Sequence, residues 1–225
     1  TKRARKNAAH HYDVGNDLYE RMLDKRMIYT CGYWKNAKNL DEAQEAKLEL
    51  ICQKLQLKPG MITLDIGCGW GGFAEYAANK YGVKVVGITP ASEQVMLAKE
   101  RINNPLVEIQ QKDYREATGS YDRIVSIGML EHVGPKNYRH FFKLCAGMLK
   151  DDGIMLHHTI GNNRSVNSTD PWMDKYIFPG GVIPSLAQIS KAIEKTLVIE
   201  DIQNFGPDYD KTLLAWHANF VRSYQ

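Results

Sequence analysis

The chain has 225 residues, of which 44% are apolar and 24% charged, and its formal net charge is +3. This composition is typical of a folded globular protein and excludes a disordered or collagen-like chain. So small a net charge gives no support for a nucleic-acid partner, and no apolar run reaches the ~18 residues of a membrane-spanning helix.

The cysteines and the chain start give two further expectations. Cys31, Cys52, Cys68 and Cys145 show no C-x-x-C spacing, which favours a reduced, cytoplasmic protein. The chain starts without Met on the basic stretch TKRARK, as a piece of a longer protein would. That stretch can touch anionic lipid headgroups, although the solvated end of a linker is the simpler explanation.

The first elements in chain order are helical and aromatic. Leu18, Met22 and Leu23 have helical spacing within the mixed polar and aromatic residues 7–30, which predicts a short helix. The aromatic loop YTCGYW follows at residues 29–34. Asn39 is a candidate N-cap for a helix that ends at Leu57, before Lys-Pro-Gly. Its apolar face is expected to hold Ala43, Ala46, Leu50, Ile51 and Leu55.

From there the pattern alternates between strands and helices. Such alternation predicts an α/β fold with a mainly parallel sheet flanked by helices, in one domain over 1–225. Residues 1–40 are expected to cover the sheet, residues 161–185 to form a lid-like loop, and a last strand to lie beyond Gln225. Strands are predicted at 62–66, 84–88, 106–110, 122–127, 153–159 and 197–203, and helices at 72–80, 91–102, 136–149, 186–195 and 210–224.

A glycine-rich turn follows the first predicted strand. In TLDIGCGWGGF, Gly67, Gly69 and Gly72 fit G-x-G-x-x-G between a strand and a helix, which is the context that gives this motif meaning. A nicotinamide site would carry an acidic ribose ligand about 20 residues on, but the next strand ends on Thr89. Asp65 instead provides a carboxylate suited to a cofactor with a cationic amino-acid tail. The D-x-G-x-G pattern resembles the first motif of class I S-adenosylmethionine-dependent methyltransferases.

Polar residues also follow the other predicted strands, at the edge where ligands bind in such sheets. Thr89 and Gln94 flank the start of a helix, where Thr89 can cap the helix or bond a ribose. Asp113 can accept from an adenine amino group, with Tyr114 covering the ring, or can simply be a turn residue. Glu131 follows the fourth strand and either faces the reaction centre or stabilises a helix N-terminus.

Several other candidates remain open on sequence grounds. His157 and His158 are adjacent in a strand and point to opposite faces, so they do not bind one metal together, and no metal site is predicted. His10-His11 is a similar weak pair. Cys31 is a potential nucleophile without an assignable base, and a buried neutral thiol is the commoner case. Tyr209 is a phenol at the start of the last helix or a packing residue.

Together these segments resemble the cyclopropane fatty acid synthase family, which includes the mycolic acid cyclopropane synthases. The match is nearest to the bacterial phospholipid members, which carry an additional N-terminal domain and a longer C-terminus. One departure is His157, where the family often has an apolar residue. The matching stretches are HYDVGNDLYERML, YTCGYW, LDIGCGWGG, VVGITPASEQ, DRIVSIGMLEHVGPKNY, HTIG, DPWMDKYIFPGG and NFGPDYDKTLLAW.

The resemblance implies a set of site residues. A bicarbonate ion would be held by the side chains of Glu131, His158 and Tyr209, with backbone groups of Cys31 and Ile160 nearby. His158 is assigned because it precedes Thr-Ile-Gly. Contacts to S-adenosylmethionine would come from Tyr29, Thr30, Asp65, Gly67, Gly69, Trp70, Gly71, Thr89, Gln94, Asp113, Tyr114 and Arg115. An apolar acyl tunnel would be lined by Tyr33, Trp34, Trp172, Tyr176, Ile177 and Phe178, although such side chains can also be plain core.

The activity implied is transfer of a methylene to a cis double bond of a phospholipid acyl chain, with bicarbonate as the base. The protein would then be cytoplasmic, peripheral to the inner face of the membrane, with an unsaturated phospholipid as its partner and a homodimer permitted for the full-length form. Two alternatives stay open: a methyltransferase for a small soluble acceptor, and a non-catalytic cofactor-binding module.

Overall fold

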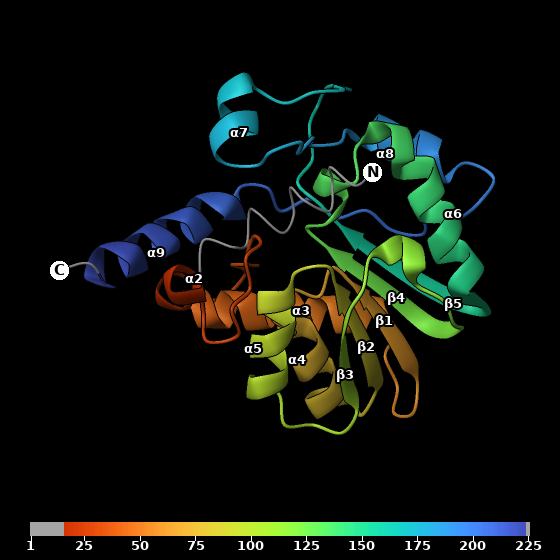
Figure 1. Ribbon diagram of the computed structural model, residues 1–225, viewed down its shortest axis with the longest axis horizontal. Coiled ribbons are helices and arrows are strands. Elements are labelled where there is room, and N and C mark those ends of the chain that lie inside the picture. Colours follow the sequence, from red (N-terminus) through yellow and green to blue (C-terminus); the bar gives the residue numbers. More distant parts are fainter. Residues whose placement is uncertain (1–15, 224–225) are drawn as a thin grey trace.

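A parallel sheet forms the centre of the computed structural model, which describes residues 16–223. Its strand order is β3-β2-β1-β4-β5, and all neighbours run parallel (Figure 1). Parallel neighbours require crossover connections, which the intervening helices provide. The predicted mainly parallel α/β fold is therefore confirmed. The strands are β1 (Ile62–Ile66), β2 (Lys84–Thr89), β3 (Val107–Gln111), β4 (Tyr121–Ile127) and β5 (Leu149–His158).

Helices cover both faces of this sheet. One face carries α3 (Leu40–Lys54), α4 (Gly72–Tyr81) and α5 (Ser92–Arg101), and the other carries α6 (Tyr138–Met148) and α8 (Leu186–Ile193) (Figure 1). Successive strand residues point to opposite faces. Val85 accordingly packs with α3–α5 and its neighbour Val86 with α6 and α8. The near-continuous apolar strands therefore build two hydrophobic cores at once.

The helix α3 begins as the sequence predicts. The Asn39 side chain accepts a hydrogen bond from the backbone N–H of Glu42 at 3.0 Å, which caps the helix. The buried face differs from the predicted one. Ala46 and Leu50 are only half-buried, whereas the polar residues Gln44 and Lys47 are buried. The helix is rotated toward residues 28–30, whose backbone carbonyls accept from Gln44.

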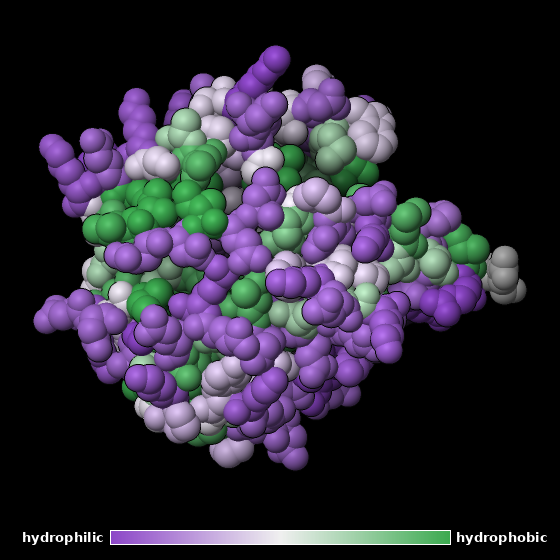
Figure 2. Space-filling view, turned by 180° about the vertical axis from the view of Figure 1, so that it is seen from behind, coloured by the Kyte–Doolittle hydropathy of each residue, from purple (hydrophilic) through white to green (hydrophobic). Residues whose placement is uncertain are grey.

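The predicted strand at 197–203 is wrong, since these residues form no regular structure. Val198 is 80% exposed and Ile202 59% exposed. Among residues 16–223, β5 pairs only with β4, so an apolar segment without a ladder partner stays irregular. Seen from behind, apolar side chains gather on the side of the molecule that carries α6, α8 and β5 (Figure 2).

A third apolar cluster joins the two ends of the described chain. The helix α2 (Asn16–Met22) packs beside α9 (Asp208–Ser223), as Figure 1 shows. Tyr19 and Trp216 are buried in this cluster together with Trp70 from the glycine-rich turn. The remainder of the predicted cover, residues 1–15 with the basic opening and the His10-His11 pair, lies outside the described residues, as does the predicted helix end at 224.

Two properties of the described chain bear on its surroundings. Between residues 16 and 223, no helix is at once long enough and apolar enough to cross a bilayer. All four cysteines are buried and none forms a disulfide.

The segment 161–185, predicted as a loop, contains the short helix α7 (Pro171–Tyr176). One carboxylate oxygen of Asp170 accepts from the backbone N–H groups of Trp172 and Met173, and Pro171 occupies the first helical position. This cap with an adjacent proline is a standard helix start. The predicted loop therefore includes a capped helix, which stands away from the sheet (Figure 1).

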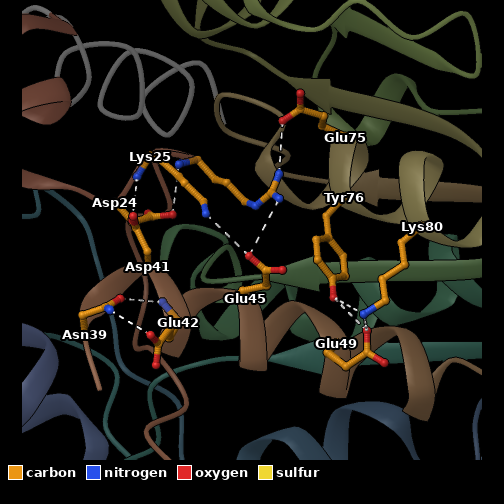
Figure 3. Close-up of polar contacts among 11 residues, drawn as sticks. Asp24, Lys25, Asn39, Asp41, Glu42, Glu45, Glu49, Glu75, Tyr76 and Lys80 are labelled. Atoms are coloured by element: carbon orange, nitrogen blue, oxygen red, sulfur yellow. Dashed lines mark hydrogen bonds and ion pairs between the residues drawn. The ribbon is translucent and has the colours of Figure 1, made fainter. Parts of the chain in front are cut away.

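The contact between α3 and α4 depends on one carboxylate (Figure 3). Partial burial raises the pKa of Glu49, but hydrogen bonds from Lys80, Tyr76, Tyr81 and Gln53 outweigh this effect and lower the pKa to about 2. The Tyr76 and Tyr81 hydroxyls donate to it at 2.8 and 2.9 Å, and Lys80 forms an ion pair at 2.9 Å.

We expect Glu49→Gln to lower the free energy of unfolding by about 1 kcal/mol at pH 7. A depressed pKa stabilises the fold above the unfolded value of 4.5, and this stabilisation is lost as the pH falls from 4.5 toward 2. Urea denaturation between pH 3 and 8 measures the difference. The control is Glu45→Gln, whose carboxylate lies 3.7 Å from Lys25 and 4.0 Å from Arg26 (Figure 3). A Glu49→Gln effect that did not shrink below pH 4.5 would contradict the prediction.

Candidate active site

A cleft opens at the carboxyl ends of the strands. It lies beside β1. The chain builds the sheet outward from β1 in one direction through β2 and β3, and then in the other direction through β4 and β5, and ligands bind at such a switch point. The lining residues are Ile66, Gly67, Gly69, Ile88, Thr89, Pro90, Ala91, Gln94, Lys112, Asp113, Tyr114, Arg115, Gly128, Met129, His132, Val133 and Asn137.

The glycine-rich turn forms the floor of this cleft. The backbone N–H groups of Gly67 and Cys68 donate to the Ile88 carbonyl at 2.9 and 3.1 Å, so the turn is fixed to the end of β2. Gly67 and Gly69 both have positive φ, at 81° and 55°. A Cβ on Gly67 would lie 2.8 Å from Met129 Cγ, whereas a Cβ on Gly69 would meet nothing within 4 Å. Gly69 therefore borders open space, where a ligand can approach the backbone closely.

Asp65 is buried at the end of β1 with one oxygen unpaired. Its side chain is 2% exposed, and Oδ2 has no hydrogen-bond partner among the described residues. Burial raises the pKa of this carboxyl to about 7. A buried carboxylate without a partner is costly, and a cation placed beside it would remove that cost. Asp65 and the turn therefore fit a cofactor that carries an ammonium group.

The cleft wall at the ends of β2 and β3 contains the other predicted cofactor residues. The Thr89 hydroxyl donates to Gln94 Oε1 at 2.8 Å, and Asp113 is held by the guanidinium of Arg115 through Nε at 2.8 Å and Nη2 at 2.6 Å. Tyr114 packs edge-on against Phe141, with ring centroids 5.4 Å apart. These side chains are fixed by the protein before any ligand arrives.

The other predicted cofactor residues lie differently. Trp70 is 4% exposed, and its Nε1 donates to Asn16 Oδ1, so its side chain belongs to the α2–α9 cluster. Gly71 does not line the cleft, because a Cβ there would meet the Ile102 side chain. Tyr29 packs against Tyr19 and Trp216, with centroids 5.2 and 5.1 Å away. The side chains of Trp70 and Tyr29 thus pack within the α2–α9 cluster.

A second group of residues gathers around Glu131, on the short helix η2 (Leu130–His132) after β4. Glu131 Oε1 accepts from the backbone N–H of Ile160 at 2.8 Å, while Oε2 is buried without a partner among the described residues. Burial raises the pKa of this carboxyl, and the hydrogen bond from Ile160 counteracts it in part. The Ile160 N–H, expected near a bound anion, is thus engaged by Glu131.

The two histidines of β5 lie on opposite sides of the sheet, as their adjacency predicts. His157 packs against Phe141 and Phe142 of α6, and burial lowers its pKa to about 4. His158 packs against Phe205, with ring centroids 5.5 Å apart, and its Nδ1 has no hydrogen-bond partner among the described residues. Burial, with a further contribution from Lys47, lowers the pKa of His158 to about 3, so its imidazole is neutral. His158 therefore faces Phe205 and the side of Lys47, whereas His157 packs in the core under α6.

Tyr209 of α9 lies near this group. Burial raises the pKa of Tyr209, and electrostatic interactions with Cys31, Tyr29 and Glu131 act in the same direction, so its phenol lies near all three. Burial also raises the pKa of Cys31, whose thiol therefore stays protonated and is a poor nucleophile. The Thr212 hydroxyl accepts from the Gly32 N–H at 3.0 Å. The aromatic loop is thus fixed against α9 next to Glu131.

The six predicted substrate residues lie in two parts of the described chain, the aromatic loop and the segment 161–185. Trp34 is held by Thr212 at 2.9 Å, and Tyr33 packs on Phe205. In the segment 161–185, Ile177 and Phe178 are half-buried. The ring centroids of Phe178 and the cleft residue His132 are 6.0 Å apart. Trp172 and Tyr176 are 58% and 61% exposed, because the two-turn helix α7 turns them outward.

Sequence reasoning missed several residues of the site. Met129, His132 and Asn137 line the cleft from the β4 side, and Thr212 organises the aromatic loop. Lys47 had a readable signal, since it lies four residues from both Ala43 and Ile51 on a predicted apolar face. A charged residue inside such a stripe is unusual unless it has a partner. No group of three or more metal-ligating side chains occurs among residues 16–223.

The glycines of the turn provide a matched pair of variants. We expect Gly67→Ala to lower the free energy of unfolding by about 2–4 kcal/mol, because its Cβ would overlap Met129 at positive φ. Gly69→Ala should cost only about 1 kcal/mol but weaken cofactor binding at least tenfold, since its Cβ enters the cleft. Thermal unfolding and calorimetric titration with S-adenosylhomocysteine measure the two effects. Equal stability losses would argue against this assignment of the two glycines.

Known proteins with this arrangement were found by sequence and by structure. A family model described as mycolic acid cyclopropane synthetase matches residues 1–225. The cyclopropane-fatty-acyl-phospholipid synthase of Escherichia coli (strain K12) is 54% identical over 95% of this chain and 56% of its own length. The cyclopropane synthase MmaA2 from Mycobacterium tuberculosis is 30% identical with a TM-score of 0.88, over 96% of this chain and 82% of that chain. Mycolic acid cyclopropane synthase CmaA1, complexed with SAH and CTAB, is 33% identical with the same TM-score of 0.88 and the same 96% and 82% coverage.

The parallel sheet with its glycine-lined cleft is the class I S-adenosylmethionine-dependent methyltransferase fold. Within that class, the chain belongs to the mycolic acid cyclopropane synthetase family. The resemblance seen in the sequence motifs is confirmed. The chain spans 56% of the length of the Escherichia coli relative.

Proposed function

We propose that this protein transfers a methylene from S-adenosylmethionine to the cis double bond of an acyl chain in a phospholipid, forming a cyclopropane ring with bound bicarbonate as the base. The observation that carries the proposal is the buried group beside the cleft. Glu131 Oε2 and His158 Nδ1 lack partners among the described residues, and the Tyr209 phenol lies near Glu131. Such a set of acceptors and donors suits a small trigonal anion with one hydroxyl.

S-adenosylmethionine supplies, when bound, an electrophilic methyl group on a sulfonium. Asp65 would pair with its ammonium group, Gly67 and Gly69 would let the backbone approach it, and Thr89 and Asp113 would hold the ribose and adenine. An alkene is a weak nucleophile, so these residues have to fix the donor in line with it. The predicted cofactor contacts from Tyr29, Thr30, Gln94, Tyr114 and Arg115 belong to the same proposal.

Addition of the methyl group to the alkene forms one C–C bond, breaks the S–CH₃ bond and leaves a carbocation on the acyl chain. Ring closure then needs removal of one proton from the new methyl group, whose electron pair forms the second C–C bond. Bicarbonate would be the weak base, and would become carbonic acid when it takes this proton. Glu131 would accept a hydrogen bond from the bicarbonate hydroxyl, while the neutral His158 and the protonated Tyr209 orient the ion.

The phospholipid partner places demands on the surface. Withdrawing about ten methylenes from a bilayer costs on the order of 8 kcal/mol, which apolar residues such as Trp34, Ile177 and Phe178 would offset. On α7, Trp172 and Tyr176 are exposed, and the Lys175 ammonium lies 4.8 Å from the Tyr176 ring centroid. Such amphipathic side chains favour the bilayer interface. We place α7 at the membrane surface, consistent with a peripheral protein at the inner face of the membrane.

The test is turnover by the full-length protein on vesicles of a cis-unsaturated phospholipid with methyl-labelled S-adenosylmethionine. We expect labelled cyclopropane fatty acids after transesterification, and a rate that falls in carbon dioxide-depleted buffer. Label found only as a simple methyl group on a soluble amine, quinone or acid would contradict the lipid substrate. Binding of S-adenosylhomocysteine without any turnover would indicate a non-catalytic module instead.

A further inference from the structure

A lysine lies buried against residue 30, beside the candidate site. Lys47 on α3 is 1% exposed, and its ammonium donates to Thr30 Oγ1 at 2.6 Å. Burial lowers its pKa to about 7, while the nearby Asp24 and Cys31 counteract this effect. No ion pair with Lys47 forms within the described part of the chain. A buried ammonium without a paired carboxylate is costly and calls for an explanation.

Lys47 is distinctive among the cations of this protein. Of the lysines and arginines between residues 16 and 223, only Lys47 and Arg123 are buried. Arg123 donates to the backbone carbonyls of Leu55, Asp122 and Asp152. It lies near the start of β4, at the opposite end of the sheet from the cleft. Lys47 is thus the buried cation of the described chain that lies on the side of the candidate site.

Thr30 connects this lysine to the site by contact. A Cβ built on Gly128 would lie 2.6 Å from Thr30 Cγ2, so the Thr30 methyl rests on the Gly128 backbone. The Gly128 N–H donates in turn to the His158 carbonyl at 2.9 Å. Thr30 therefore lies between Lys47 and the turn that leads to Glu131. One turn earlier on α3, Gln44 Nε2 donates to the Thr30 carbonyl at 2.8 Å and fixes the same segment.

The charge of Lys47 reaches two of the residues near the candidate site. Its charge acts on the pKa of both Cys31 and His158. His158 is neutral and Glu131 can only contribute negative charge, so neither offers a full positive charge to an anion. An anion held beside a buried carboxylate needs a nearby cation, because attraction between charges is strong where water is excluded.

We infer that Lys47 is a positioning residue of the candidate active site, whose positive charge, held against Thr30, enables the group formed by Glu131, His158 and Tyr209 to bind bicarbonate. This inference rests on the proposed function for the identity of the anion. It assigns a role to a residue outside the set that the motifs of the family resemblance supply. The bound bicarbonate would also be the anionic partner that the Lys47 ammonium lacks among the described residues.

The test measures anion binding directly. The full-length protein, saturated with S-adenosylhomocysteine, is titrated with sodium bicarbonate by calorimetry. We expect Lys47→Met to weaken bicarbonate binding at least tenfold while the affinity for S-adenosylhomocysteine changes less than threefold. Lys47→Gln retains a donor toward Thr30 but not the charge, and should show the same loss. It serves as the second variant where Lys47→Met folds poorly.

The matched control is Gln44→Met, which removes the other α3 hydrogen bonds to residues 28–30 without changing the charge. It should leave bicarbonate affinity within threefold of the unsubstituted protein. Equal losses in Gln44→Met and Lys47→Met would overturn the inference, since the lysine would then be only a structural support. Unchanged bicarbonate affinity in Lys47→Gln would overturn it as well.

Turnover on unsaturated phospholipid, measured in parallel, separates this inference from the proposed function. If the unsubstituted protein forms no cyclopropane yet binds bicarbonate tenfold more tightly than Lys47→Met, the proposed reaction fails and the role of Lys47 stands. If the unsubstituted protein is active and Lys47→Met binds bicarbonate equally well, only the role of Lys47 fails. Absence of bicarbonate binding to the unsubstituted protein would overturn the inference.

Discussion

Glu131→Gln should retain the affinity of the full-length protein for S-adenosylhomocysteine and lose about 100-fold or more in kcat. The glutamine keeps the volume of the side chain, and its carbonyl oxygen can still accept from the Ile160 N–H at the position of Oε1. It presents an N–H₂ group where Oε2 now accepts, so it cannot hold the hydroxyl of the base. Loss of a group that positions a proton transfer typically costs 10²–10⁴-fold in rate.

Single-turnover rates with phospholipid vesicles, together with calorimetric titration, measure these two quantities. Glu100→Gln on the exposed side of α5 is the control, and should leave both unchanged. A parallel loss of cofactor affinity and rate in Glu131→Gln would assign Glu131 a structural role. Thermal unfolding of both variants then separates a local from a global effect.

Asp65→Asn should weaken the binding of S-adenosylhomocysteine by about 100-fold, because the charged partner of the ligand ammonium is lost. The same substitution should stabilise the ligand-free protein above pH 7. Burial raises the pKa of Asp65 to about 7 from the ordinary value of 3.8. The folded protein therefore binds a proton that the unfolded chain has released, and stability falls as the pH rises from about 4 to about 7. The side-chain amide of the variant does not ionise, so this decline, at most about 4 kcal/mol, disappears.

Urea denaturation of the ligand-free proteins at pH 5 and pH 8 measures the stability term. The difference in stability between Asp65→Asn and the unsubstituted protein should favour the variant more at pH 8 than at pH 5. Titrations over the same range should show cofactor affinity rising through pH 7 in the unsubstituted protein alone. A variant that is less stable at pH 8 and still binds S-adenosylhomocysteine normally would contradict the assignment of Asp65.

Short sequence patterns predict several residues of the candidate site. The turn at Gly67 and Gly69 needs positive φ and a close approach to its surroundings, and these demands are readable in the residue types. Asp65 is identifiable because a carboxylate next to such a turn is out of place in an apolar strand. His157 and His158 were assigned to opposite faces by strand periodicity, but only the packing of Phe141 and Phe142 decides which face each occupies.

Other parts of the site depend on contacts between distant segments. Lys47 is buried because α3 is rotated toward residues 28–30, and this rotation is set by helix packing rather than by helical periodicity. The segment 197–203 has strand propensity but no ladder partner among the described residues. Trp172 and Tyr176 read as lining residues in the sequence, yet the α7 helix turns them to the surface.

By itself, the sequence determined the alternation of strands and helices, the parallel sheet, the glycine turn and the family, because each is encoded by short-range periodicity or by motifs of adjacent residues. Only the tertiary structure decided which polar groups lack partners among the buried, described residues, and that Tyr209 of α9 lies near Glu131. Burial and the absence of a partner depend on the whole surroundings of an atom. The pKa values of Asp65, Glu131 and His158 follow from that burial and so could not be read from the chain alone.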